Sequence, residues 1–458
     1  MISLKEAHIG SGNKPVTLLF AAGLPMQLPP TNTTAPHWPG RGRARGVRIN
    51  SVCRILATMK NDVSITGLGL ITPLGLTAHA NWSAICPTRN LAGAALGPES
   101  FKPTGVPTEK TSKLEVMDRG VIAEQHLQDM EALYRPHLRL DRLGGLTPDR
   151  VIRLALVAAC QALEHAGWLS RTADRPDTAL FVATSKGPVL SSLEACRRLG
   201  QSGPAGVDAS LAWHVSHGPA AIAVAIAAAL DMHVHTTCVG ACAGALIATH
   251  RARQALVHGH CRRALVVAAD ASLHPLFESS FDNLGVLAQP EMDGHRRCHP
   301  FAQQGGGFFI SEGAAAICLE KGGAPGSLNL ENSWTGADGT HLVGTDPRAG
   351  SLIGGLKTLS VPPPPNFVHA HAAGTRNDPI ELAAIRHVFG PAPEVFSCKQ
   401  WLGHSLGAAG LISLVLSALC HEHRQTLTGH TLPAASRSIT IAQGFGGHIA
   451  MCELKSNG

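Results

Sequence analysis

The chain has 458 residues, more than one hydrophobic core usually holds, so we expect two packed units. Apolar residues make up 44% and aromatic residues only 4%, and glycine occurs 49 times, which favours closely layered helices and sheets over disorder. The net charge of +6 is modest and no basic run is interleaved with aromatic residues, which argues against nucleic acid as the main partner.

The cysteines and the apolar segments indicate a cytoplasmic protein. The twelve cysteines stand at irregular spacings and no credible secretory signal opens the chain, so we expect reduced thiols. The apolar run 16–24 is too short and too poorly flanked for an anchor, and no membrane span is predicted.

The first 59 residues lack the periodicity of a folded unit. They contain Pro-Pro-Thr-Asn-Thr-Thr and Gly-Arg-Gly-Arg-Ala-Arg-Gly, which are typical of a disordered extension. Met59 directly precedes a well-formed domain start, which favours a mis-assigned initiation site over a functional basic arm.

From residue 63 the sequence alternates between strand and helix patterns. The first strand ends in a Gly/Pro turn and feeds a helix that contains Asn81 and Trp82. The following patterns are a helix over 149–167, a strand over 178–184, a buried apolar run over 219–230, a turn with Cys242 and a helix behind it, and a strand over 264–270.

The second half repeats this plan. An apolar stretch over 307–320, broken by Glu312 and Gly313, looks like its opening. A proline linker over 362–365, a strand over 367–371, a helix over 378–389, a Gly/Ala-rich helix start over 397–410, an apolar helix to residue 419 and a closing strand after 439 follow. The helix start at 397–410 is the expected counterpart of the Cys242 helix, so an internal duplication is predicted.

Strands that alternate with helices imply βαβ units and a mainly parallel sheet, so the predicted fold class is α/β. We place the domains at 60–290 and 291–458, behind the extension 1–59. The nucleophile is expected in the first domain.

Cys242 is the candidate nucleophile. An apolar run gives way there to a turn, and a helix of small residues follows. The unpaired backbone N–H groups and the positive end of the macrodipole at a helix start both favour thiolate over thiol, so we expect a lowered pKa for this cysteine.

A zinc site is the weaker interpretation of this stretch. His233, His235, Cys238 and Cys242 offer four ligands, but their spacing matches no common zinc module. Cys238 is expected to pack in the core, and neither a metal nor a cofactor is predicted.

The motifs from residue 63 to residue 454 form one ordered set. They are the Gly67–Gly75 opening, Ala241-Cys242 with Leu246 and His250, Pro300-Phe301, Ser311-Glu312-Gly313, His371-Ala-Ala-Gly-Thr375, Asp378-Pro-Ile-Glu381, Lys399, Gly403-His404, Gly407-Ala-Ala-Gly410 and Gly444-Phe-Gly-Gly447. In kind and order they resemble the condensing enzymes of the thiolase fold, in particular the β-ketoacyl-acyl-carrier-protein synthases and polyketide ketosynthases. One such motif alone would be weak, and together they are a strong signal.

The resemblance implies a thiolase-like fold of two pseudo-duplicated halves with α-β-α-β-α layers. It makes Cys242 the acyl-accepting nucleophile, and His371 and His404 the pair that serves decarboxylation and condensation. Lys399 matches the family's structural and electrostatic lysine. Phe445 matches the gating phenylalanine, whose backbone N–H joins that of Cys242 in the oxyanion hole.

The resemblance also implies supporting acidic residues and a reaction. Asp378, Glu381 and Glu312 match acidic positions that support the site. The implied reaction is decarboxylative Claisen condensation of an acyl thioester on Cys242 with malonyl carrier protein, in fatty-acid-like or polyketide biosynthesis. Two imidazoles that donate hydrogen bonds to the enolate oxygen make this feasible without a metal or cofactor. Acyl carrier protein is the implied partner, and a homodimer or a heterodimer with a paralogue is the implied assembly.

Four segments depart from the family's pattern. The segment His371-Ala-Ala-Gly-Thr375 replaces the usual His-Gly-Thr-Gly-Thr, and Ala302–Gly307 replaces the charged residues that usually follow Pro-Phe. Gly240-Ala241 stands where Thr-Ala usually precedes the nucleophile, and His448 stands where Thr or Ser usually follows Gly-Phe-Gly-Gly. These differences favour a specialised pathway over housekeeping fatty-acid synthesis.

Two other functions stay open. The altered loop after His371 is compatible with acyl transfer to a hydroxyl or amine without decarboxylation. The missing charges are compatible with a non-catalytic subunit that shapes the chain-length pocket of a partner synthase. Retention of Cys242, both histidines and Lys399 favours the catalyst.

Overall fold

The computed structural model describes residues 62–86, 120–143, 148–170, 178–203, 217–302, 306–322 and 327–458, and the backbone of two short strands before them. Those strands, β1 (Lys5–Ala7) and β2 (Leu18–Phe20), pair antiparallel within a separate unit, residues 1–59. The disordered extension and the alternative start predicted there otherwise lie outside the described residues.

The strands of residues 60–458 form two sheets that meet at one edge. Their order is β10-β9-β11-β12-β8-β3-β7-β6-β4-β5, and among the described strands β8 and β3 share one residue pair, Asn329 with Ser64. The first sheet contains β3 (Val63–Ile71), β4 (Thr178–Thr184), β5 (Val234–Val239), β6 (Arg263–Asp270) and β7 (Gly313–Lys321). The second contains β8 (Asn329–Ala337), β9 (Phe367–His369), β10 (Glu394–Phe396), β11 (Ala435–Gly444) and β12 (His448–Asn457).

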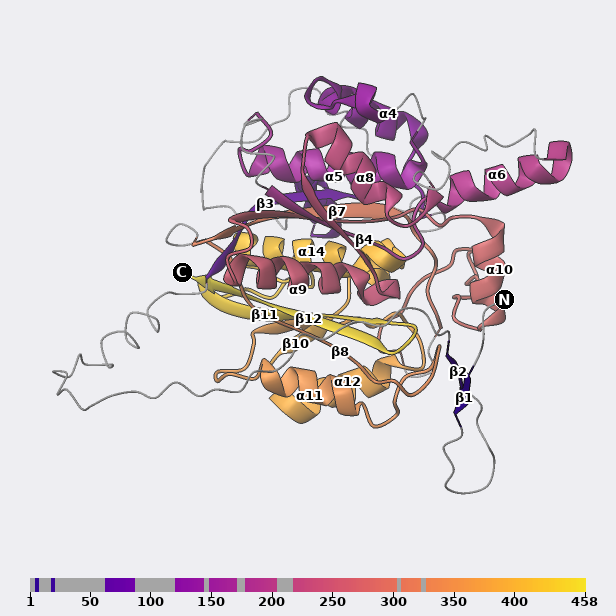
Figure 1. The fold of residues 1–458 in the computed structure, drawn as a ribbon. Coiled ribbons are helices and arrows are strands. Elements are labelled where there is room, and N and C mark those ends of the chain that lie inside the picture. The colour runs from indigo at the N-terminus through magenta and orange to yellow at the C-terminus, as the bar shows by residue number, and fades with distance from the viewer. Residues whose placement is uncertain are drawn as a thin grey trace, which may run out of the picture. The chain divides into compact units, whose positions relative to one another are not determined.

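Helices form the other layers, as Figure 1 shows. Between the sheets lie α9 (Gly244–Val257) and α14 (Ala409–His423). The outer face of the first sheet carries α4 (Glu124–Tyr134), α5 (Arg150–His165) and α8 (Ala221–Leu230), and that of the second carries α11 (Gly350–Thr358) and α12 (Asp378–Phe389). The predicted α-β-α-β-α layering is therefore confirmed.

Shorter elements complete the chain. The helices are α2 (Ala78–Ile85), α6 (Val189–Ser202), α10 (Pro275–Asn283) and α13 (Lys399–Leu402), and the 3₁₀ helices are η1 (Arg135–His137), η2 (Leu140–Leu143), η5 (Ala241–Ala243) and η6 (Leu406–Ala408). Two of these 3₁₀ helices, η5 and η6, directly precede the central helices α9 and α14.

The two sheets share one connectivity, which confirms the predicted duplication. Apart from inserted helices, the chain runs β3-α5-β4-α8-β5-α9-β6-β7 and then β8-α11-β9-α12-β10-α14-β11-β12, and the strand orders match. In the first half β4 pairs parallel with β5 and β6, and β7 pairs antiparallel with β6. In the second half β9 pairs parallel with β10 and β11, and β12 pairs antiparallel with β11. The turn that carries Cys242 therefore corresponds to the turn after His404.

The predicted opening of the second half is wrong. Strand β7 pairs antiparallel with β3 and β6, so it closes the first sheet, and the second half opens at β8. The halves therefore divide within 322–328 and not at 290–291. The apolar run predicts a strand correctly, but it carries no information about which strand is its partner. The sequence therefore could not show to which sheet β7 belongs.

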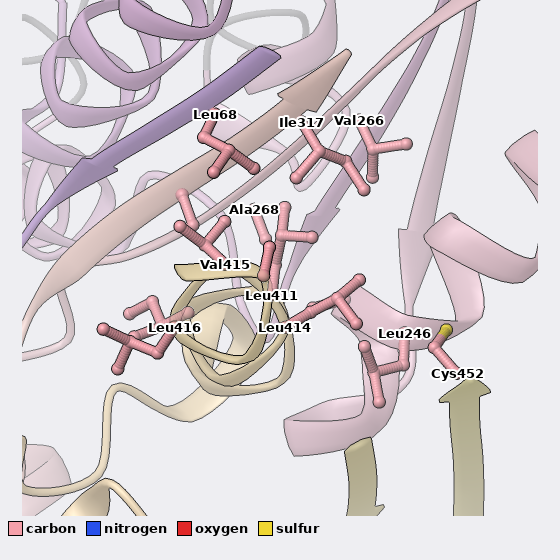
Figure 2. Close-up of a cluster of buried hydrophobic side chains, with 14 of the residues drawn as sticks. Leu68, Leu246, Val266, Ala268, Ile317, Leu411, Leu414, Val415, Leu416 and Cys452 are labelled. Carbon is pink, nitrogen blue, oxygen red and sulfur yellow. The ribbon is translucent and has the colours of Figure 1, made fainter. Parts of the chain in front are cut away.

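The apolar core between the sheets fixes the central helices. Strands β4 and β6 are buried along almost their whole length, which explains their continuous apolar pattern. Figure 2 shows the side chains that meet there: Leu411, Leu414, Val415 and Leu416 of α14, Leu246 of α9, and Leu68, Val266, Ala268, Ile317 and Cys452 of the sheets. Burying one such leucine contributes about 1.5–3 kcal/mol.

The segment Leu406–His423 is long and apolar enough to cross a membrane, judged by length and composition alone. Some 89% of it is buried within the protein, between the two sheets. Its hydrophobicity is therefore accounted for by its place in the core.

Candidate active site

Cys242 lies in η5, where β5 passes into α9. Ala241, directly before it, has a φ of 47°, a left-handed conformation that costs a non-glycine residue about 1–3 kcal/mol. The same conformation recurs in the corresponding turn of the second half, where Leu406 has a φ of 43°. Both turns lie directly before helices that the core holds in place, so the surrounding packing maintains the strain.

One cavity of about 110 Å³ brings the predicted residues together. The sequence separates them widely, because they come from different elements of both halves. The predicted residues that line the cavity are Cys242, His371, Asp378, Glu381, His404 and Phe445. The constellation predicted from motifs is therefore assembled in three dimensions.

The two histidines approach each other inside the protein. Their ring centroids are 5.5 Å apart and their planes are inclined by 76°. His404 is held by its backbone, because its N–H donates to the carbonyl of Phe309 at 2.9 Å and its carbonyl accepts from Ser311 N at 3.1 Å. The ring centroid of Phe308 lies 4.8 Å from that of His404, in an edge-to-face arrangement. These contacts leave His404 little freedom to turn.

Burial keeps both imidazoles neutral. It lowers the pKa of His371 and of His404 well below the usual value, and the positive charge of Lys399 lowers both further. Among the described residues, His404 Nδ1 is buried without a hydrogen-bond partner. Neutral rings can exchange protons with a ligand in the cavity, and this nitrogen retains bonding capacity.

Lys399 is buried at the start of α13, beside the histidine pair. Its ammonium donates to the carbonyl oxygen of His371. A buried ammonium needs a hydrogen-bond partner, and this carbonyl supplies one. The charge acts on Cys242 and on both histidines.

The protonation of Cys242 differs from the prediction. Burial raises the pKa of its thiol to about 11, against the opposing effects of Lys399 and then Lys186. Desolvation is therefore the largest influence on this thiol, and the sequence could not show it because burial depends on the whole fold. The free protein holds a thiol, and a base must take its proton before attack.

Asp378 and Glu381 support the loop that follows His371. Glu381 accepts the backbone N–H groups of His371 and Ala372, each at 2.8 Å. Asp378 accepts the backbone N–H groups of Phe301, Ala373, Gly374 and Thr375. The altered loop after His371 is therefore held by two carboxylates from the first turn of α12.

Burial also sets the charge of Glu381. It raises the pKa of this carboxyl to about 7, and Asp378 adds to the effect, whereas the two backbone donors and Lys399 oppose it. Glu381 can thus exist in either protonation state near neutral pH.

Phe445 lies in the Gly444–Gly447 turn between β11 and β12, and it is 36% exposed. A Cβ added to Gly444 would stand 3.0 Å from Cys242 N, so this turn runs directly against the nucleophile's backbone. The Phe445 ring lies 6.3 Å from that of Phe281. A gate at the cavity and a shared oxyanion hole fit this placement and remain predictions.

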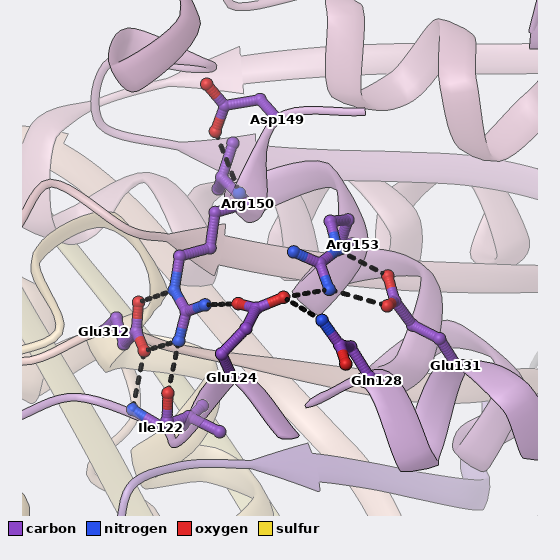
Figure 3. A network of polar contacts seen from close by, with 9 residues as sticks. Ile122, Glu124, Gln128, Glu131, Asp149, Arg150, Arg153 and Glu312 are labelled. Atoms are coloured by element: carbon purple, nitrogen blue, oxygen red, sulfur yellow. Dashed lines mark hydrogen bonds and ion pairs between the residues drawn. The ribbon is translucent and has the colours of Figure 1, made fainter. Parts of the chain in front are cut away.

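Glu312 does not line the cavity. Figure 3 shows that it accepts from Ile122 N and from two nitrogens of Arg150, while Arg150 also pairs with Glu124. Its contribution to the site is indirect, through the preceding Ser311, whose N–H binds the His404 carbonyl. The motif identified the segment correctly, but the side chain points to the outer helices.

Two residues near the site were not identified from the sequence. Asp270 ends β6 and accepts from Ser185, Ser272 and the backbone N–H of Gly407, which ties the first half to the His404 turn. Lys186 follows β4, and its ammonium donates to Ser185 Oγ at 2.9 Å. Polar residues directly after buried parallel strands were the available signal, because those strand ends meet at one edge.

The predicted alternative of a zinc site finds no assembled ligand set. Within the described ranges, no group of three or more His, Cys, Asp or Glu side chains is arranged to hold a metal ion. On the surface, His233 Nε2 instead lies 3.9 Å from Asp231 Oδ1.

Family models match both halves of the chain. The N-terminal domain of beta-ketoacyl synthase matches residues 60–323, and the C-terminal domain of beta-ketoacyl synthase matches residues 365–432. The first match covers the segment from β3 to β7, which is the first sheet and its helices. The end of this match at residue 323 lies within the division at 322–328 that the sheet order gives.

Two curated relatives illustrate the sequence similarity. The chain is 31% identical to the 6-methylsalicylic acid synthase of Arthrobotrys oligospora over 79% of its own length. It is 27% identical to one of the subunits of the phenolphthiocerol/phthiocerol polyketide synthase of Mycobacterium tuberculosis over 80% of its own length. It spans only 21% and 20% of the length of these relatives.

Two solved structures illustrate the similarity of the fold. A type II polyketide ketosynthase in complex with its acyl-carrier protein has a TM-score of 0.66 at 20% identity, and 86% of this chain covers 99% of that one. The ishigamide ketosynthase/chain length factor has a TM-score of 0.65 at 21% identity, and the match covers 87% of this chain and 99% of that one.

Proposed function

The chain belongs to the β-ketoacyl synthase family, and from that premise we propose that it catalyses decarboxylative Claisen condensation of an acyl group carried on Cys242. The observation that carries this proposal is the single cavity that Cys242, His371 and His404 line. A condensing transferase needs a nucleophile and proton-exchanging groups at one point, and this cavity supplies them.

The first step of the proposed reaction is acyl transfer. A neutral histidine accepts the Cys242 proton, and the sulfur attacks the carbonyl of an acyl thioester on a carrier protein. The carbon–sulfur bond to the carrier breaks, a new one to Cys242 forms, and the proton leaves with the carrier thiol. Backbone N–H groups of Cys242 and Phe445 stabilise the oxyanion, and losing one such donor typically costs about a hundredfold in rate.

The second step is decarboxylation and condensation. A malonyl thioester loses carbon dioxide, and its enolate oxygen accepts hydrogen bonds from the neutral rings of His371 and His404. The enolate carbon then attacks the acyl carbonyl, the bond to the Cys242 sulfur breaks, and the released thiolate takes a proton from solvent to restore the thiol. Lys399 and the carboxylates of Asp378 and Glu381 act by positioning and polarising the histidines.

A non-catalytic subunit is the second candidate, because one of the structures of similar fold pairs a ketosynthase with a chain length factor. The departures from the family's motifs favour it, whereas the assembled Cys242, His371 and His404 favour a catalyst. Acyl transfer without decarboxylation is the third candidate, and it rests on Ala372 and Ala373 in the loop after His371.

We propose acyl carrier protein as the partner, polyketide or related lipid assembly as the process, and the cytoplasm as the location. A solved ketosynthase of similar fold is bound to its acyl-carrier protein, which supports the first part. We propose a dimer built on β5, since this edge strand pairs only with β4 among the described strands and exposes Val234 and Val239 by 59% and 55%.

Intact-mass spectrometry with acyl and malonyl carrier proteins tests the proposed function. Wild-type protein should gain one acyl adduct on Cys242 and release carbon dioxide from the malonyl carrier. Cys242→Ala should lose the adduct, and Cys196→Ala, which removes an exposed thiol on α6, should keep it. His404→Ala should lower carbon dioxide release by about a hundredfold or more.

An adduct that persists in Cys242→Ala would contradict the nucleophile. Full adduct formation without carbon dioxide release would favour acyl transfer. Activity that appears only with a co-purified paralogue and survives Cys242→Ala would favour the non-catalytic role.

A further inference from the structure

Lys186 places a second ammonium group near the nucleophile, in addition to Lys399. It lies in the turn after β4. Cys242 follows β5 and Asp270 ends β6, and both strands pair with β4, so the three residues share one edge of the first sheet. The charge of Lys186 acts on Cys242 and on His404, as the second largest cationic influence on each after Lys399.

The Lys186 side chain has a built surrounding. Its Nζ donates to Ser185 Oγ at 2.9 Å and to Ser272 Oγ at 3.4 Å. Both serine hydroxyls donate in turn to Asp270, at 2.5 Å in the case of Ser272. The lone pairs that face Lys186 are therefore polarised toward it, and the ammonium is held in position without a direct ion pair.

No carboxylate of the described residues forms an ion pair with Lys186 within 4 Å. The oxygens of Asp270 are occupied by the two serines and by the backbone N–H of Gly407. An ammonium has three donors, and the serines accept from it in two directions. One donor and the full positive charge therefore remain for a ligand.

Aromatic rings connect this ammonium to the cavity of Cys242. Lys186 Nζ lies 5.1 Å from the ring centroid of Phe277 and 5.8 Å from that of Phe281. Phe281 lines the cavity and meets Phe308, which contacts His404. Lys186 thus lies behind Phe281, one of the residues that line the cavity.

We propose that Lys186 selects the acyl group on Cys242, and that this group is short and bears a carboxylate at its far end. The proposal rests on the proposed function, since it names the substrate class of the same site. The methylene groups of a dicarboxylic half-thioester would lie along Phe281, and the distal carboxylate would meet the ammonium. A purely apolar acyl chain would leave a half-buried charge without a counter-ion.

Acylation of Cys242 by small thioesters tests this assignment. Succinyl and butyryl thioesters of N-acetylcysteamine have the same number of acyl carbons and differ in the carboxylate. They lack a phosphate and a carrier, so a preference between them reflects the acyl group alone. Wild-type protein should be acylated faster by the succinyl thioester, as followed by intact mass.

Lys186→Met should lower the succinyl-to-butyryl rate ratio by about tenfold or more, since charge-assisted bonds are roughly twice as strong as neutral ones. Lys186→Glu should invert the ratio. The matched control Lys357→Met removes an exposed lysine on α11 and should leave the ratio unchanged.

The possible results separate the two proposals. Acylation by both thioesters with a ratio that Lys186→Met does not change would overturn the role of Lys186 and leave the proposed function intact. A Lys186→Met protein with an unchanged ratio but slower carbon dioxide release from malonyl carrier would also overturn it, and would assign the cation to the extender carboxylate. Failure of both thioesters to acylate Cys242 would overturn both proposals.

Discussion

At the scale of single residues, burial decides the chemistry of the site. The thiol of Cys242 has a raised pKa of about 11, and the two imidazoles have pKa values well below the usual one, so the resting site is neutral at its reacting atoms. The positive charges that act on these groups come from Lys399 and Lys186, and Asp270 adds a negative charge that acts on Cys242. This arrangement suits a proton transfer from sulfur to imidazole that begins only when a substrate is bound.

Removal of the Lys399 charge should shift these equilibria in a defined direction. Lys399 lowers the pKa of Cys242 and of both histidines, so Lys399→Met should raise all three. The rate of Cys242 alkylation by iodoacetamide should fall by about tenfold at fixed pH for each unit by which its pKa rises. The acid limb of the pH–rate profile for condensation should move to higher pH, because the histidines would become protonated at a higher pH than in the wild type.

The measurement is a pH series of both rates, with Lys357→Met as the control for loss of a surface charge. Identical alkylation profiles for the wild type and Lys399→Met would show that Lys399 does not act on the sulfur.

At the scale of elements, equivalent turns position the reacting groups. The 3₁₀ helices η5 and η6 precede α9 and α14, and each contains a non-glycine residue with positive φ. The apolar core that Figure 2 shows holds α9 and α14 in place. Duplication of one strand–turn–helix unit has thus placed Cys242 in the turn of one half and His404 beside the corresponding turn of the other.

Strand β5 carries the prediction at this scale. If two copies pair through β5, Val239→Asp should place like charges near the twofold axis and weaken the dimer by about tenfold or more in Kd. Analytical ultracentrifugation over a concentration series measures this. Val361→Asp, an exposed site 60% accessible in the second half, is the matched control. An unchanged Kd in Val239→Asp would exclude β5 as the interface.

At the scale of the whole molecule, buried neutral histidines couple stability to pH. The Nε2 of His369 accepts from Cys398 N at 3.1 Å and its Nδ1 bonds to Ser417 Oγ at 3.0 Å, while His421 lies between Ser436 and Ser438. Burial lowers the pKa of His369 to about 3 and that of His421 to about 4. The His369 site is satisfied only by a neutral ring, because Nε2 must accept the Cys398 N–H, whereas burial alone disfavours the charged ring of His421.

The sign of the effect follows from the lowered values. Unfolded histidines titrate near ~6.5, so between that pH and the folded pKa the unfolded chain binds more protons. The free energy of unfolding should therefore fall as the pH drops from about 6.5 toward 4, by roughly 1.4 kcal/mol per pH unit for each such histidine. Glu381, with its pKa raised to about 7, acts in the opposite direction, since its contribution falls as pH rises through 7.

Urea unfolding at pH 7, 6 and 5 measures this dependence. His421→Gln should reduce the slope between pH 6 and 5 by about 1.4 kcal/mol per pH unit relative to wild type. The exposed His258 provides the matched control, and His258→Gln should keep the wild-type slope. Equal slopes in all three proteins would contradict the assignment of a neutral buried His421.

Single residues show where sequence reasoning reached its limit. Cys242, His371 and His404 were identified because each stands in a motif with local turn chemistry. Lys186 and Asp270 were not, because their relation to the site exists only where the ends of neighbouring strands meet. Glu312 was assigned to the site by its motif, and the structure turns it toward Arg150 instead.

The sequence by itself determined the elements, their alternation, the duplicated plan and Cys242 as the candidate nucleophile, because periodicity and turn chemistry depend on residues close together in the chain. The tertiary structure decided the pairing of β7, the boundary between the halves, the protonated state of Cys242 and the position of Lys186. Strand pairing, desolvation and electrostatic influence depend on groups that are distant in the chain and meet only after folding.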